Sequence, residues 1–208
     1  MTDELRDNLR AAYDKNVDER EGRAPWKKQV AEREAFLAHM QFHGFQSLLD
    51  VGAATGIDGR YFADNGIDVT CIDLSAENNL AAQAKGLKAL EMDATAMSFP
   101  ADFFDAVWSW DCLLHLPQLE WPRALSEIQR VLKPGGLFFL GVYGGLDFEG
   151  VWEEDLYRPK RFYSFMVDDT FNALMGRYFD PIDFHTHRIS SAAPAKHFQA
   201  FTGRNRLI

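Results

Sequence analysis

The stretch that decides the fold is Leu48-Leu49-Asp50-Val51-Gly52-Ala53-Ala54-Thr55-Gly56. Apolar residues run up to Asp50, small residues follow, and a helix-forming segment, Ile57 to Asp64, comes next. This order predicts a buried strand, a tight turn and a helix N-terminus. The free N–H groups of such a turn can face a ligand, and glycine or alanine lets the backbone approach that ligand closely. The stretch therefore predicts a ligand site at the end of a strand.

Strand-like and helix-like segments alternate after this turn. The predicted strands are Ser47–Val51, Asp68–Asp73, Leu87–Met92, Phe103–Ser109 and Leu137–Tyr143, and the predicted helices between them include Ala76–Lys85 and Gln118–Leu132. Such alternation predicts an α/β fold with a mostly parallel, doubly wound sheet that has helices on both faces. A charged and aromatic loop is expected over Leu146–Phe165 and a helix over Asp168–Arg177. Two final strands, Tyr178–Thr186 and Lys196–Thr202, should then pair antiparallel at the sheet edge.

The first 44 residues precede the predicted first strand. Residues 3–21 favour a helix, and a second helix is expected from about Trp26 to Met40. We expect this N-terminal helical extension to cover the sheet. A sharper alternative is a lid over the ligand, because Tyr13 and Trp26 place large aromatic groups on this segment.

Bulk properties limit the possible functions. The 208 residues carry a formal net charge of −9 and contain two cysteines, Cys71 and Cys112, outside any metal-binding spacing. An acidic chain without a basic block is not expected to bind nucleic acid. We find no signal-peptide pattern and no run long enough to span a bilayer, so the expectation is a cytoplasmic protein without membrane contact, as a monomer or homodimer.

Two acidic residues follow later strands. Asp73 ends the second strand, 21 residues after Gly52, where a carboxylate can accept hydrogen bonds from both hydroxyls of a ribose. Asp93, in Met92-Asp93-Ala94, follows the third strand. It could accept a hydrogen bond from an adenine amino group, or serve as a turn or N-cap aspartate. Together with the glycine turn, these residues favour an adenosine-containing ligand.

A family resemblance emerges from the motifs taken together. They are Leu48 to Gly56, Asp73-Leu74-Ser75, Met92-Asp93-Ala94, Phe104-Asp105-Ala106-Val107, Leu113-Leu114-His115-Leu116, and Glu127 to Gly136 with its Arg-Val-Leu-Lys-Pro-Gly-Gly ending. In order and spacing this set resembles the class I S-adenosylmethionine-dependent methyltransferases. The resemblance is strong over residues 47–143. One departure is Ala54, which stands where the family turn usually has glycine.

The resemblance implies a Rossmann-like seven-stranded sheet of order 3-2-1-4-5-7-6 with strand 7 antiparallel, and S-adenosylmethionine as cofactor. Within one domain of residues 1–208, it implies a cap (1–44), a cofactor-binding core (45–143) and an acceptor loop with the last strands (144–208). The expected cofactor-binding residues are Tyr13, Trp26, Asp50, Gly52, Ala53, Ala54, Gly56, Asp73, Leu74, Met92, Asp93, Ala94 and Trp110. Of these, Asp50, Gly52 and Gly56 would line the methionine end of the cofactor. The aromatic faces of Tyr13, Trp26 and Trp110 would favour a cationic methyl donor.

The expected function is methyl transfer to an oxygen or nitrogen atom of a small-molecule acceptor. Such a transfer requires a base, and the candidates in order are His115, Asp111 and Tyr143. His115 could instead be a structural histidine, and Asp111 a helix cap. A non-catalytic cofactor-binding module remains an alternative. A nicotinamide-dependent oxidoreductase is disfavoured, because Gly52 and Gly56 do not have its glycine spacing.

His185 and His187 are two residues apart and so share one face of a strand. A third metal ligand is not evident near them in the sequence, so we expect no metal site.

Overall fold

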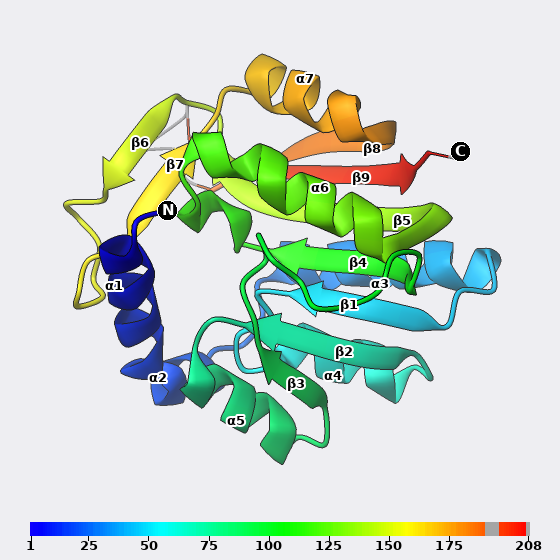
Figure 1. Ribbon diagram of the computed structural model, residues 1–208, viewed down its shortest axis with the longest axis horizontal. Helices are drawn as coiled ribbons and strands as arrows, with labels where there is room; N and C mark the ends of the chain where they lie inside the picture. The colour runs from blue at the N-terminus through cyan, green and yellow to red at the C-terminus, as the bar shows by residue number, and fades with distance from the viewer. Residues whose placement is uncertain (190–195, 207–208) are drawn as a thin grey trace.

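The computed structural model describes residues 1–189 and 196–206. The chain begins with three helices and then builds a central sheet with helices around it (Figure 1). The helices are α1 (Asp3–Asp14), α2 (Val17–Glu21), α3 (Lys27–Phe42), α4 (Ile57–Asp64), α5 (Ala76–Ala84), α6 (Trp121–Val131) and α7 (Asp168–Tyr178), with short 3-10 turns η1 (Leu113–His115) and η2 (Gln118–Glu120). The strands are β1 (Ser47–Val51), β2 (Asp68–Asp73), β3 (Lys88–Glu91), β4 (Phe104–Trp110), β5 (Leu132–Gly144), β6 (Phe148–Val151), β7 (Phe162–Phe165), β8 (Phe179–Arg188) and β9 (His197–Asn205).

The seven-stranded sheet has the order β3-β2-β1-β4-β5-β9-β8. β1 pairs parallel with β2 and with β4, whereas β9 pairs antiparallel with both β5 and β8. With β8 and β9 counted as the sixth and seventh strands, this is the predicted order 3-2-1-4-5-7-6 with strand 7 antiparallel, so the predicted fold class is confirmed. The parallel strands all end at one edge, which therefore collects the loops that follow β1, β2, β3 and β4.

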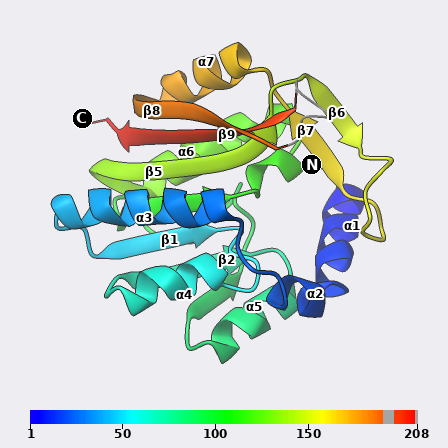
Figure 2. The same cartoon turned by 180° about the vertical axis from the view of Figure 1, so that it is seen from behind.

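Helices cover both faces of the sheet (Figures 1 and 2), and each face has its own hydrophobic core. On one face, Phe36 of α3 and Phe62 of α4 pack with Trp108 of β4. On the other, α6 and α7 contribute Leu125 and Phe171 to a second cluster. Alternate residues of a strand point to opposite faces, which is why neighbouring residues of β4 serve different cores.

The first two helices, α1 and α2, lie across the carboxyl ends of the strands (Figure 1). Instead of one helix over residues 3–21, α1 ends at Asp14 and α2 begins at Val17. The break lets the chain turn at the sheet edge. Arg10 of α1 donates to the carbonyl of Leu74 at 3.1 Å, which fixes α1 over the loop after β2. The cap is therefore divided: α1 and α2 lie at the ligand edge, whereas α3 covers one face of the sheet, as the sequence predicted.

Two other sequence expectations need correction. The predicted loop Leu146–Phe165 contains a two-stranded antiparallel sheet, β6 with β7. Its aromatic residues pack on one another, as Phe148 does on Phe165. β5 begins at Leu132, directly after α6, rather than at Leu137: Leu132 pairs with Phe104 and Leu137 with Ala106, and Gly135, with a φ of 78°, lies in the irregular stretch between these pairs. Within the described ranges, no helix is both long and apolar enough to cross a membrane.

Candidate active site

The turn after β1 is held by left-handed backbone at Gly52, Ala54 and Gly56, with φ values of 71°, 49° and 79°. At Gly52 the need for glycine comes also from packing, since a Cβ there would lie 2.3 Å from Cys112 Cβ and Sγ. Ala54 adopts a conformation that favours glycine. Its backbone N–H donates to Asp73 Oδ2 at 2.9 Å, which joins the loops after β1 and β2.

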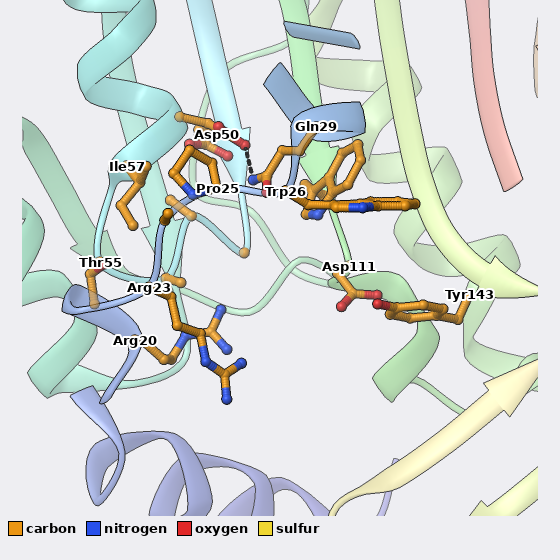
Figure 3. A pocket seen from close by; sticks show the side chains of 16 residues that line it. Arg20, Arg23, Pro25, Trp26, Gln29, Asp50, Thr55, Ile57, Asp111 and Tyr143 are labelled. Atoms are coloured by element: carbon orange, nitrogen blue, oxygen red, sulfur yellow. Dashed lines mark hydrogen bonds between the residues drawn. The ribbon is translucent and has the colours of Figure 1, made fainter. Parts of the chain in front are cut away.

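A cavity of about 250 Å³ opens beside this turn (Figure 3). Three parts of the chain line it: the turn itself, the segment from α2 to α3, and the ends of β4 and β5. The lining residues are Arg20, Arg23, Ala24, Pro25, Trp26, Gln29, Asp50, Gly52, Ala53, Ala54, Thr55, Ile57, Asp58, Trp110, Asp111 and Tyr143. This is the cavity that the sequence predicted at the end of the first strand.

Two charged residues of opposite sign line the cavity with unused hydrogen-bonding atoms. Asp50 Oδ2 and Arg20 Nε are both buried and have no hydrogen-bond partner within the described part of the chain. Burial raises the pKa of Asp50 well above its usual value, and the carboxylates of Asp58 and Asp73 add to the effect. A ligand with both an ammonium and a carboxylate, as on an amino acid, would supply the missing partners.

Asp73 is held in place by its own neighbours. Oδ1 accepts from Ser75 N at 2.8 Å and from Asn78 Nδ2 at 3.3 Å, while Oδ2 accepts from Ala54 N. Burial raises the pKa of this carboxyl, although these donors oppose the rise. The side chain is thus oriented before any ligand arrives, as a ribose-binding carboxylate requires.

A second, mainly apolar cavity of about 40 Å³ adjoins the first at Gly52. Among its lining residues are Asp73, Leu74, Met92, Asp93, Ala94 and His115. Asp93 acts as a turn aspartate, since Oδ1 accepts from the backbone and the hydroxyl of Thr95 at 2.8 Å. Its Oδ2 accepts from Arg6 at 3.0 Å. The predicted adenine-binding residues therefore meet around one apolar slot, with Asp93 already paired.

Aromatic rings form the wall of the larger cavity near the end of β4. Trp26 contacts Trp110 edge-on, with ring centroids 6.5 Å apart, and Trp110 stacks on Phe198 at 4.3 Å. Tyr143, at the end of β5, lies next to Asp111 (Figure 3). Aromatic faces of this kind attract cations.

Asp111 combines several unusual properties at this wall. Its φ is 57°, a left-handed backbone conformation that stores strain and is seen at functional positions. Oδ1 is buried without a hydrogen-bond partner among residues 1–189 and 196–206. Burial raises its pKa to about 6, against the lowering effect of Arg20 and Arg161. A carboxylate with this pKa can take up a proton near neutral pH.

His115 is buried, and both of its ring nitrogens have partners. Nε2 lies 2.7 Å from the hydroxyl of Tyr13, and Nδ1 lies 2.8 Å from the carbonyl oxygen of Phe162. Burial lowers the pKa of His115 to about 3, helped by the positive charge of Arg161. The ring is therefore neutral at neutral pH. It lines the smaller cavity, whereas Asp111 and Tyr143 line the larger one.

The structure brings most of the predicted residues to one of the two cavities. Tyr13 and Gly56 line neither: Tyr13 faces His115, and Gly56 packs against α5. Sequence reasoning missed Arg20, whose guanidinium lies 4.9 Å from the centroid of the Tyr13 ring. Only the chemistry of the expected ligand could have pointed to Arg20, because the carboxylate of an amino acid requires a cation beside it.

Comparisons with known proteins agree with this geometry. A family model described as a methyltransferase domain matches residues 49–140. A sterol 24-C-methyltransferase of Gibberella zeae is 35% identical over 126 residues, covering 56% of this chain and 32% of that protein. A malonyl-[acyl-carrier protein] O-methyltransferase of Enterobacter lignolyticus is 33% identical over 108 residues, covering 50% of this chain and 41% of that protein. The chain therefore spans less than half the length of these curated relatives.

A solved structure with the same fold is the 1,6-didemethyltoxoflavin-N1-methyltransferase of Burkholderia thailandensis, with bound 1,6-didemethyltoxoflavin and S-adenosylhomocysteine. Its TM-score is 0.73 at 22% identity, and the match covers 97% of this chain and 87% of that one.

The sheet order and the cavity after β1 define a Rossmann-like methyltransferase fold. Residues 49–140 match a methyltransferase domain, which confirms the resemblance of the motifs to the class I S-adenosylmethionine-dependent methyltransferases. The cofactor of the domain is S-adenosylmethionine. The buried atoms of Asp50 and Arg20 that have no hydrogen-bond partner within residues 1–189 and 196–206 carry the charges that its amino-acid end requires.

Proposed function

We propose that this chain transfers a methyl group from S-adenosylmethionine to an oxygen or nitrogen atom of a small-molecule acceptor. The observation that carries the proposal is Asp111, a carboxyl group with a pKa of about 6 and an unpaired oxygen at the cavity that Asp50 also lines. The two curated relatives described above methylate a carbon and an oxygen, so they leave the acceptor atom open.

The chain's own residues would bind and orient the cofactor. Asp50 would accept from the ammonium group, Arg20 would donate to the carboxylate, and Asp73 would accept from the ribose hydroxyls. When bound, the cofactor supplies a methyl group on a positively charged sulfur. The cations and carboxylates needed for binding are already in place around the cavity, so little reorganisation is required on binding.

Asp111 would act as the general base. An acceptor O–H or protonated N–H group beside it would give its proton to Oδ1, and the oxygen or nitrogen atom would bond to the methyl carbon as the carbon–sulfur bond breaks and S-adenosylhomocysteine is left. Burial raises the pKa of the Tyr143 hydroxyl to about 12, so this group stays protonated and can donate a hydrogen bond to the acceptor. His115 is less suited to the role because both of its nitrogens are engaged and its pKa is about 3.

The walls of the cavity favour a small acceptor. The segment from Arg20 to Gln29 closes one side, and Trp110 with Tyr143 closes another (Figure 3). A pocket enclosed by aromatic rings and a few polar groups is typical of small-molecule sites. A macromolecular acceptor would have to present its target atom through this wall.

The test uses the full chain, S-adenosylmethionine and a panel of phenols, carboxylic acids and amines, with formation of S-adenosylhomocysteine as the readout. We expect Asp111→Asn to lower the rate at least about 100-fold on the best acceptor, the usual effect of losing a general base. Its affinity for S-adenosylhomocysteine should stay near that of wild type. The matched control is Asp102→Asn, because Asp102 is an exposed aspartate that also has a positive φ.

Full activity of Asp111→Asn would reject Asp111 as the base. Tight binding of S-adenosylhomocysteine without turnover of any acceptor would favour a non-catalytic binding module. Tight binding of NAD, without binding of S-adenosylmethionine or S-adenosylhomocysteine, would reject methyl transfer altogether.

A further inference from the structure

Three side chains with metal-binding groups converge outside the cofactor cavity, between α3 and β8. Glu32 comes from α3, and His185 and His187 come from β8. His185 Nε2 lies 2.7 Å from Glu32 Oε1, and His187 Nε2 lies 2.5 Å from the same oxygen. One ligand atom from each of the three residues lies within 4.8 Å of the others. The sequence offered no third group near the two histidines, whereas the packing of α3 beside β8 supplies Glu32.

We propose that Glu32, His185 and His187 bind a divalent transition-metal ion of the Zn²⁺ type. Two imidazoles and one carboxylate are a ligand set that Zn²⁺ uses, with a fourth position left for water. The glutamate is a buried side chain, 8% exposed, on the inner side of the cluster. A carboxylate in this position needs compensating positive charge, which a metal ion supplies.

Asp183 supports this assignment from outside the ligand set. Its Oδ2 lies 2.6 Å from His185 Nδ1, so Nδ1–H donates to it. In a neutral ring, His185 Nε2 is then an acceptor that faces another acceptor, Glu32 Oε1. A cation must lie between them, which is either a second proton on the ring or a metal ion. A carboxylate that orients the far nitrogen of a ligating histidine is a common feature of zinc sites.

The distances allow a metal ion after a small adjustment. Ligand atoms about 2.0–2.1 Å from a tetrahedral Zn²⁺ are about 3.3 Å from one another. The two histidine nitrogens would therefore move away from Glu32 Oε1 by roughly 0.6–0.8 Å, the difference between that spacing and the present contacts. The His185 side chain is 41% exposed and so has room to move.

The site would anchor one wall of the cofactor cavity. Trp26 is the N-cap residue of α3 and lines the cavity, and its ring lies edge-on to His187 at 5.9 Å between centroids. A metal bridging Glu32 to β8 would hold the first turns of α3, and with them Trp26, against the edge of the sheet. We therefore infer a structural rather than a catalytic metal.

The test is a titration of the untagged, chelator-treated full chain with Zn²⁺, and with Co²⁺ as a spectroscopic probe. We expect one ion per chain, Co²⁺ absorption typical of tetrahedral coordination, and a rise in Tm with added Zn²⁺. His187→Ala should weaken binding at least 100-fold, and Asp183→Asn about 10- to 100-fold. His39→Ala is the matched control, because His39 is an exposed histidine on the same helix.

Binding of Zn²⁺ that His187→Ala and Glu32→Gln leave unchanged would overturn the proposal, as would the absence of stoichiometric binding to the wild type. The cluster would then be a hydrogen-bonded ion pair that joins α3 to β8. If His187→Ala does not fold, Asp183→Asn decides the question, because Asp183 is exposed and its replacement leaves the packing intact. None of these readouts depends on methyl transfer, so the result stands apart from the proposed activity.

Discussion

The hydroxyl of Tyr13 lies 2.7 Å from Nε2 of His115, although 102 residues separate them in the chain. His115 Nδ1 faces the carbonyl oxygen of Phe162, so Nδ1 carries the proton and Nε2 accepts from Tyr13. Arg161 donates to the same tyrosine hydroxyl at 3.1 Å. One hydroxyl thus joins α1, the turn after β4 and the β6–β7 insertion, and it fixes the N-terminal cap on the ligand edge.

Tyr13→Phe should loosen this cap. The substitution leaves His115 Nε2 buried without a donor, so we expect a loss of about 1–3 kcal/mol in the free energy of unfolding. Urea denaturation measures the loss, and limited proteolysis should show earlier cleavage before residue 27. Tyr61→Phe is the control, because the ring of Tyr61 contacts the Arg33 guanidinium, 4.3 Å from the ring centroid, and not His115. Equal effects of the two substitutions would contradict the role of the Tyr13 hydroxyl.

Asp50→Asn should weaken cofactor binding while it stabilises the free protein. The substitution removes a charged acceptor for the ammonium group, which corresponds to about 1.5–3 kcal/mol or roughly 10- to 100-fold in Kd. Because burial raises the pKa of Asp50, removal of its charge should also raise Tm. Calorimetry with S-adenosylhomocysteine and a thermal melt check both effects. Asp64→Asn is the control, because Asp64 is an exposed aspartate at the end of α4. It should change neither the Kd for S-adenosylhomocysteine nor Tm.

Asp111 should make stability depend on pH. Its pKa is about 6 in the folded protein and 3.8 as an ordinary aspartate, so the folded state holds the proton more tightly. The wild type therefore loses stability as the pH rises from about 4 to about 6, by up to about 3 kcal/mol at 1.4 kcal/mol per pKa unit.

Asp111→Asn should accordingly be more stable than wild type at pH 8, with the difference vanishing near pH 4. Chemical denaturation across this range measures it, with Asp102→Asn as the control. A difference that does not change with pH would show that Asp111 keeps an ordinary pKa.

Gly52→Ala should be more harmful than Gly66→Ala, although both glycines have a positive φ. A Cβ on Gly52 would meet Cys112 at 2.3 Å, whereas a Cβ on Gly66 would meet nothing within 4 Å. The pair therefore separates steric overlap from backbone strain. We expect Gly52→Ala to cost about 1–3 kcal/mol more than Gly66→Ala in urea unfolding. Equal costs would mean that the Cys112 side chain simply moves aside.

Much of the fold follows from local sequence patterns. In the stretch Leu48–Gly56, the apolar run predicts a strand and the small residues predict a turn, and the helix formers that follow predict a helix. The structure has these elements in the same places. The position of Asp73 at the end of β2 is equally local. The carboxyl ends of parallel strands lie at one edge of the sheet. The sequence alone therefore predicts that residues at these strand ends lie at the same edge. The sheet order was predicted by resemblance to a family rather than by these patterns alone.

What the sequence by itself determined was which residues form strands and helices and which of them end at the ligand edge. Only the tertiary structure decided which distant side chains meet: Arg20 with the cavity of Asp50, Tyr13 with His115, and Glu32 with His185 and His187. Periodicity tells which face of an element is apolar, but it does not tell which element packs against that face. These contacts depend on where α1 and α2 cross the sheet edge and on how α3 lies beside β8. That placement is set by the packing of the whole chain.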